Sequence, residues 1–224
     1  MKIKAIITGA SGMVGEGVLL ECLRDPDVEA VLLLGRKPSG HAHPKLREVI
    51  HADFQALEDV ANQLTGYDAC FYCAGISSLG VSRQEYERVT YDTTLAVAHT
   101  LLRLNPKLSF GYVTGAGTDG SEKGRSHWAR TKGRTENALL RLPFRSAHMF
   151  RPGYLHPTPG QRHALKPYRY LGWLYPVLRR VAPGTASTLQ ELGRAMLAAA
   201  RGGYPKPVLE VRDIVALAHD QAAA

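Results

Sequence analysis

Residues 2–24 read KIKAIITGASGMVGEGVLLECLR, and this stretch decides the fold. A short apolar run leads into three glycines with the spacing G-x-x-G-x-x-G, and a helical pattern follows them. Glycines at this spacing let the chain turn sharply, let a pyrophosphate reach the backbone amides, and let the helix pack closely on the strand. We therefore predict a dinucleotide-binding turn whose ligand-binding residues are Gly9, Ser11, Gly12, Met13, Val14 and Gly15.

The chain beyond this turn alternates between strand-like and helix-like patterns. The strand-like runs are short, continuous and apolar, which is typical of strands buried on both faces of a parallel sheet. They occupy residues 2–8, 28–35, 46–52, 68–75, 108–115 and 145–153, and the clearest helical patterns cover 13–24, about 84–104 and about 126–141. This alternation predicts an α/β protein with a doubly wound parallel sheet, the Rossmann fold.

The 224 residues are enough for one large domain and few for two. The pattern changes after Pro152, so we expect residues 155–224 to form a small helical lobe on the substrate side of this single domain. Within it, residues 162–180 interleave basic and aromatic side chains, which suits a substrate lid, a homodimer face or a membrane-surface helix. Pro167 and Pro176 argue against one long amphipathic helix and favour the lid or the interface.

The formal net charge of +8 is unevenly distributed. Residues 1–100 hold 9 Lys and Arg against 13 Asp and Glu, whereas residues 101–224 hold 19 against 7. A basic half suits an anionic ligand, but no basic tail or nucleic-acid-binding motif accompanies it. We therefore expect a small-molecule substrate and no nucleic acid. No apolar run reaches transmembrane length, so we also expect a cytoplasmic protein.

Cys70 and Cys73 form a C-x-x-C pair, the spacing found in many redox and metal sites. They lie in the strand-like run DACFYCAG, where side chains three apart point to opposite faces of a sheet. No second cysteine or histidine pair completes a metal site. We interpret both as core residues and expect no bound metal.

Arg36 and Lys37 follow the second predicted strand, about 20 residues after the glycine turn. A carboxylate at this point usually binds the ribose 2′-hydroxyl of NAD. The sequence LLLGRKP instead offers two cations, which suit the 2′-phosphate of NADP. The sequence therefore favours NADP(H) over NAD(H).

The order of these motifs resembles the short-chain dehydrogenase/reductase superfamily, in particular its small atypical members related to the Tat-interacting-protein and epimerase/dehydratase families. The resemblance covers nearly the whole chain and weakens after residue 160. It is carried by TGASGMVG (8–15), LLGRK (33–37), ADF (52–54), CAG (73–75), YVTGAG (112–117), Lys132 with its following residues, and FRPGY (150–154).

The resemblance implies positions for further ligand-binding residues along the chain. Asp53 and Phe54 would lie near the adenine. The run Cys73, Ala74 and Gly75 would line the adenosine ribose and the phosphates. Towards the nicotinamide, the expected residues are Thr114, Lys132, Pro152, Gly153 and Tyr154.

The position of the usual proton donor departs from the superfamily. Its active members carry Tyr-x-x-x-Lys on a helix, with the tyrosine as the acid and the lysine on the nicotinamide ribose. This chain has Trp128 four residues before Lys132, and an indole is no acid near neutral pH. His127 and Tyr154 are candidates to replace the tyrosine, although each also suits a plain hydrogen-bonding role.

Two functions follow from these observations. The first is an NADP(H)-dependent oxidoreductase, or an epimerase-like relative, with a non-standard proton donor; its candidate catalytic residues are Lys132, Thr114 and Tyr154. The second is a catalytically silent NADP(H)-binding sensor or scaffold, which Trp128 favours.

Overall fold

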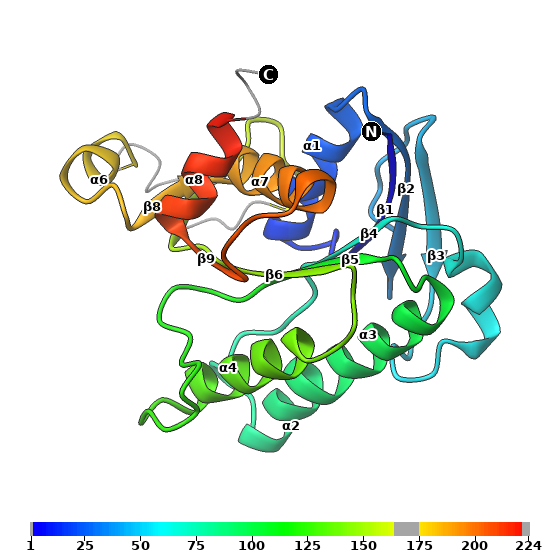
Figure 1. Ribbon diagram of the computed structural model, residues 1–224, viewed down its shortest axis with the longest axis horizontal. Helices are drawn as coiled ribbons and strands as arrows, with labels where there is room; N and C mark the ends of the chain where they lie inside the picture. Colours follow the sequence, from blue (N-terminus) through cyan, green and yellow to red (C-terminus); the bar gives the residue numbers. More distant parts are fainter. Residues whose placement is uncertain (1, 164–174, 221–224) are drawn as a thin grey trace.

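A computed structural model describes residues 2–163 and 175–220. Its main sheet has seven strands in the order β3-β2-β1-β4-β5-β6-β9, and all the neighbouring strands run parallel (Figure 1). The strands are β1 (Ile3–Thr8), β2 (Val28–Gly35), β3 (Leu46–Ile50), β4 (Ala69–Tyr72), β5 (Ser109–Val113), β6 (Ser146–Arg151) and β9 (Val208–Glu210). The predicted doubly wound α/β fold is confirmed.

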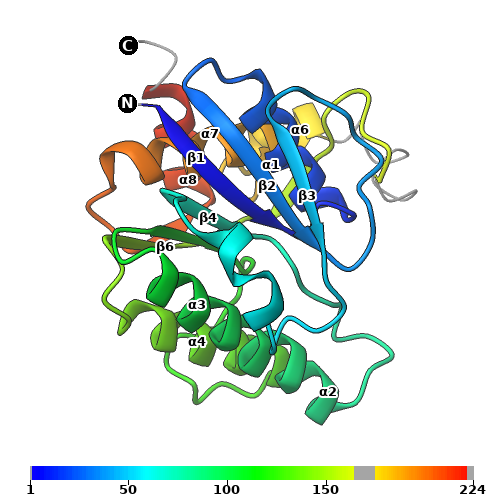
Figure 2. The ribbon, with the colours of Figure 1, turned by 90° about the vertical axis from the view of Figure 1, so that its right-hand side faces the viewer.

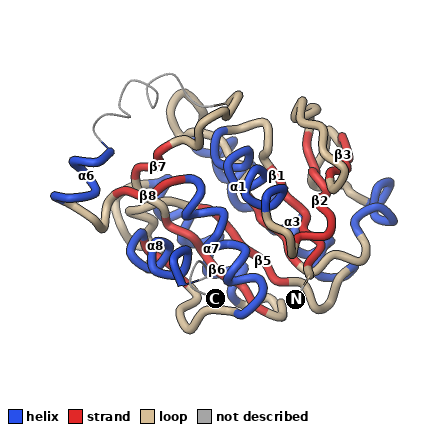
Figure 3. Tube along the Cα trace, turned by 90° about the horizontal axis from the view of Figure 1, so that it is seen from above, coloured by secondary structure: helices blue, strands red, loops and turns tan. Residues whose placement is uncertain are grey.

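Helices cover both faces of this sheet (Figures 1 and 2). One face carries α1 (Met13–Arg24), α7 (Leu189–Gly202) and α8 (Val211–Asp220), which lie side by side in Figure 3. The other face carries α2 (Arg83–Glu87), the π-helical turn η2 (Arg88–Asp92), α3 (Thr93–Leu104) and α4 (His127–Leu140). A 3-10 helix, η1 (Glu58–Leu64), links β3 to β4.

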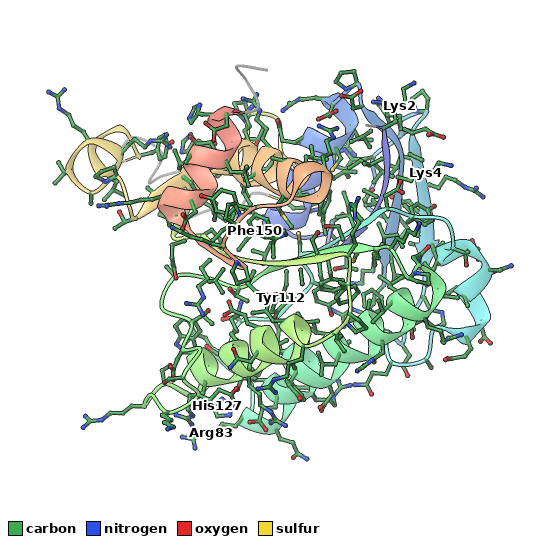
Figure 4. The ribbon with its side chains drawn as sticks, in the orientation of Figure 1. Lys2, Lys4, Arg83, Tyr112, His127 and Phe150 are labelled. Carbon is green, nitrogen blue, oxygen red and sulfur yellow. The ribbon has the colours of Figure 1, made fainter. Side chains whose placement is uncertain are left out.

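The sheet separates two apolar cores, because successive strand side chains point to opposite faces. Phe150 of β6 packs into the core under α1, α7 and α8, and Tyr112 of β5 packs into the core above α3 and α4. Figure 4 shows the two rings on opposite sides of the sheet. Cys70 lies in the second core, and the partly buried Cys73 packs against the first, so the two cysteines face opposite ways.

Residues 155–224, for which the sequence predicts a small helical lobe within the single domain, also contribute elements to the main layers. β9 is an edge strand of the main sheet, and α7 packs directly on α1, where the Leu189 side chain lies against Gly17. Among the described elements of this region, α6 (Tyr175–Val181) precedes β8, and β7 (Tyr154–His156) and β8 (Ala186–Thr188) form a two-stranded sheet of their own. Of the basic aromatic segment 162–180, residues 164–174 lie outside the described residues.

Candidate dinucleotide-binding site

The glycine turn joins β1 to α1, with Gly12 as the N-cap of the helix. Gly9 has a φ of 75°, and a Cβ there would come within 2.7 Å of the Cys73 carbonyl and the Ala74 amide. A Cβ on Gly15 would overlap the Gly9 carbonyl. A Cβ on Gly12 would lie 3.4 Å from the Gly9 carbonyl oxygen, an ordinary contact, so the turn without a ligand has room for a side chain there. Gly9 and Gly15 are thus required by the fold, whereas Gly12 keeps a surface open.

That surface belongs to a cleft of about 630 Å³ at the carboxyl ends of β1, β4 and β5. Its lining residues are Gly9, Gly12, Met13, Val14, Gly15, Cys73, Ala74, Gly75, Ile76, Ser77, Thr90, Tyr112, Val113, Thr114 and Lys132. The N-terminus of α1 opens into one part of it, and Lys132 of α4 lies in the same cleft. Unpaired amides and the helix dipole make such an N-terminus a site for anions.

A smaller pocket of about 110 Å³ adjoins the cleft and shares Ala74, Gly75 and Ile76 with it. Its other lining residues are Arg36, Ala52, Asp53, Phe54, Tyr72, Arg88, Val89 and Thr93. Residues from four separate parts of the sequence therefore line this pocket, which adjoins the cleft.

Several residues that the sequence suggested as ligands line neither cavity. Ser11 and Lys37 are exposed. The Pro152 carbonyl accepts a hydrogen bond from the Ala116 amide, and the Tyr154 amide donates to the carbonyl of Thr185 at 2.9 Å. Gly153, between them, packs so closely on Thr185 that a Cβ would overlap it. The Pro152–Tyr154 turn is thus held by backbone contacts.

At the other end of the cleft, the Nζ of the half-buried Lys132 donates to the carbonyl oxygen of Thr114 at 2.7 Å. Burial lowers the pKa of Lys132 to about 8, and the negative charge of Glu136 opposes this shift. Lys132 can therefore lose or gain a proton close to neutral pH. The other ionisable groups that line the cleft behave differently, because burial raises the pKa of Cys73 to about 12 and holds that of Tyr112 well above its ordinary value.

The Thr114 hydroxyl points into a buried charge network. It donates to Glu136 Oε1 at 2.6 Å, and Arg151 Nε donates to the same oxygen at 3.0 Å. Arg151 also binds the other Glu136 oxygen and, through Nη1, Glu210 at 3.1 Å. Glu136 is 1% exposed, so its charge depends on these partners. Because Glu136 already accepts the Thr114 hydrogen, this hydroxyl cannot donate it to a ligand at the same time.

Trp128 occupies the position of the usual tyrosine in the first turn of α4 and lies beside Gly117, where its ring would be 3.6 Å from an added Cβ. His127 lies at the outer end of α4 (Figure 4), with Nε2 at 3.3 Å from Glu87 Oε1 and its ring edge-on to Tyr86. His127 lines neither cavity, so the geometry does not favour it as a proton donor.

Sequence reasoning missed Glu136, Arg151, Arg88 and Thr90. The first had a usable signal, since Lys132 and Glu136 are four residues apart and share one face of a helix. Arg151 could not be paired with Glu136 without the crossing of α4 and β6. Arg88 and Thr90 depend on a π-helical turn, which leaves no pattern in the sequence.

Comparison with known proteins agrees with this fold. The model of the NAD-dependent epimerase/dehydratase family matches residues 5–129, and the chain belongs to this family. It is 30% identical over 141 residues to Leucinostatins biosynthesis cluster protein T of Purpureocillium lilacinum, which covers 61% of this chain and 51% of that protein. It is 28% identical over 152 residues to Protein HTATIP2 of Rattus norvegicus, covering 66% and 61%. The chain thus spans less than two thirds of these relatives.

Among solved structures, the fold resembles DesIV, a dTDP-glucose 4,6-dehydratase of Streptomyces venezuelae crystallised with NAD bound. The TM-score is 0.65 at 18% identity, covering 98% of this chain and 81% of that one. This likeness supports the Rossmann fold. Within residues 2–163 and 175–220, no helix combines the length and apolar character needed to cross a membrane.

Proposed function

We propose that the cleft binds a nicotinamide dinucleotide and that the protein is an oxidoreductase acting on a small molecule. The observation that carries this proposal is the continuity of the site, from the Arg36 pocket past the glycine turn to Lys132. The pyrophosphate would meet the N-terminus of α1, the adenosine would enter the pocket with Asp53, and the nicotinamide end would lie towards Thr114. The bound dinucleotide would supply or accept a hydride.

NADP(H) is the proposed form of the dinucleotide. Arg36 lines the adenosine pocket at the end of β2, where a carboxylate would favour NAD. A guanidinium offers the 2′-phosphate a planar, charge-assisted pair of hydrogen bonds. Lys37 is exposed and lines neither cavity, so Arg36 carries the preference.

Lys132 is our candidate for the proton transfer that accompanies hydride transfer. It lines the cleft, and its pKa of about 8 suits exchange of a proton near neutral pH. The Thr114 carbonyl fixes the ammonium group in position. Tyr154 stays a second candidate, although its backbone is tied to the small second sheet and it does not line the cleft.

The test is turnover of NADPH with a panel of aldehydes, ketones and quinones, followed by the variants Lys132→Arg and Tyr154→Phe. Lys132→Arg keeps a positive charge that donates hydrogen bonds but holds its proton at all accessible pH values. If Lys132 transfers the proton, Lys132→Arg loses turnover while it still binds NADPH. If Lys132→Arg retains turnover and Tyr154→Phe abolishes it, Tyr154 is the donor and the assignment to Lys132 is wrong.

A second function, a silent NADP(H)-binding sensor or scaffold, is favoured by Trp128. Under this alternative NADPH binds, and no carbonyl compound of the panel is turned over. Trp128→Tyr would restore the Tyr-x-x-x-Lys pair at the correct helical spacing. Activity of Trp128→Tyr on a compound that is inert with the wild type would support the silent function, and wild-type turnover would exclude it.

A further inference from the structure

Arg88 stands in the wall of the adenosine pocket together with Arg36. The two arginines come from unrelated parts of the chain, one from the loop after β2 and one from the π-helical turn η2. Asp53 and Phe54 complete the same pocket. Two guanidinium groups on one small pocket form a site for an anion with several acceptor oxygens.

The π-helical turn explains why Arg88 faces this pocket. The Thr93 amide donates to the Arg88 carbonyl, which is the five-residue hydrogen bond of a π-helix, and the Thr93 hydroxyl donates to the same oxygen at 3.0 Å. In a regular α-helix, residues five apart would lie about 140° apart around the axis. The wider turn brings Arg88 and Thr93 onto one wall of the pocket, while Thr90 lines the main cleft. Such turns recur at functional sites.

The side chain of Arg88 is held in place without a ligand. Its Nε and Nη2 donate to the two carboxylate oxygens of Glu85 at 2.9 and 2.8 Å. These bonds leave Nη1 without a partner among the described residues. A guanidinium that is already oriented loses less conformational freedom when it binds an anion.

We infer that Arg88 and Arg36 together form the binding site for the 2′-phosphate of NADP(H), with Arg88 as a second specificity-determining residue. This inference rests on the proposed function, in which adenosine occupies the pocket. A phosphate dianion has enough acceptor oxygens for one guanidinium on each side. The Asp53 carboxylate lines the same pocket and repels a phosphate there. A second guanidinium offsets this repulsion, which is why Arg88 is needed beside Arg36.

The experiment measures the affinities of NADPH, NADH, 2′,5′-ADP and 5′-AMP by calorimetry for wild type and Arg88→Gln. We expect Arg88→Gln to weaken NADPH and 2′,5′-ADP about five- to tenfold and to leave NADH and 5′-AMP within about twofold. Arg83→Gln is the matched control, because it removes the same charge from the exposed outer end of α2 (Figure 4). It should change none of the four affinities.

The combined variant Arg36→Gln/Arg88→Gln sharpens the test. Two arginines on one phosphate depend on each other, so the loss in NADPH affinity should differ from the product of the single losses. If Arg88 served only to pair with Glu85, Arg88→Gln would leave the NADPH affinity unchanged, because an exposed Glu–Arg pair contributes little to the stability of the fold. The inference is overturned if Arg88→Gln leaves NADPH affinity unchanged or weakens NADPH and NADH equally. If the wild type binds NADH and NADPH equally tightly, the proposed preference for NADP(H) is wrong, and the inference about Arg88 fails with it.

Discussion

The two ends of the cleft are built in different ways. At the glycine turn, the ligand-facing surface is backbone, and its shape depends on three residues without side chains. At the far end, the surface is made of side chains, and Lys132, Thr114 and Glu136 are fixed by a buried charge network. Under the proposed function, a local backbone turn would bind the dinucleotide, and side chains assembled from distant parts of the chain would serve the chemistry. The turn has the glycine spacing of a dinucleotide-binding motif, while α4, which supplies Lys132 to the far end, carries Trp128 in place of the usual tyrosine.

The largest expected effects come from valine substitutions within the glycine turn. Gly15→Val should prevent folding, because its Cβ would overlap the Gly9 carbonyl. Gly12→Val should fold, since Gly12 has an extended φ of −114° and no atom within 3.4 Å of its Cβ position. It should nevertheless lose dinucleotide binding by more than about 100-fold, because the side chain would fill the pyrophosphate position.

Circular dichroism and NADPH titration of the two variants separate these roles. A folded Gly15→Val would contradict the requirement for close packing of α1 on β1. Normal NADPH binding by Gly12→Val would show that the glycine turn is only a structural turn.

The next effect concerns the charge network. Glu136→Gln leaves Arg151 without a full countercharge and replaces the carboxylate that accepts from Thr114 with a neutral amide. Removing one partner of a buried ion pair typically lowers the free energy of unfolding by about 3–5 kcal/mol. We expect a loss of about 3 kcal/mol, because the amide oxygen still accepts hydrogen bonds and Glu210 still pairs with Arg151. Urea unfolding measures it. Glu58→Gln removes an exposed carboxylate and should leave the midpoint unchanged. A Glu136→Gln protein as stable as wild type would show that the network is not needed for folding.

The glycine turn could be predicted from the sequence and the network could not, for a physical reason. The turn is local: strand, glycines and helix follow one another, and each glycine answers a steric requirement of its neighbours. Arg36 was found for the same reason, as it directly follows a recognisable strand. Glu136 meets Thr114 and Arg151 only after β5, β6 and α4 assemble, across 22 and 15 residues.

The C-terminal elements show the same limit of local patterns. The VLE strand β9 is three residues long, too short to be assigned to the main sheet from its pattern. The packing of α7 on α1 depends on Gly17 and Gly193, which let the two helices approach. The lobe proposed for residues 155–224 was an inference from a change in local pattern, and tertiary contacts place much of it in the main layers.

A smaller effect comes from the titration of Lys132. Its pKa is about 8 in the folded protein, against about 10.4 for an unfolded chain, because burial disfavours the charged form. Between these values the unfolded chain binds more protons, so the free energy of unfolding rises with pH. Lys132→Met lacks this titration. The stability of wild type relative to Lys132→Met should therefore increase between about pH 7 and about pH 10, by at most about 3 kcal/mol.

Urea unfolding at several pH values checks this prediction. Lys123→Met removes an exposed lysine from the loop before α4, and its stability relative to wild type should not vary over the same range. Parallel pH profiles for wild type and Lys132→Met would contradict a lowered pKa at this position.

The measurement that tests the central claim most directly is the ratio of NADPH to NADH affinity in wild type and in Arg36→Asp. A charge-assisted hydrogen bond contributes about 1.5–3 kcal/mol, so wild type should bind NADPH roughly 10- to 150-fold more tightly. Arg36→Asp places a carboxylate beside the adenosine pocket and should reverse the preference while the fold is retained. Equal affinities in wild type, or a preference for NADH, would contradict the proposal that Arg36 selects NADP(H).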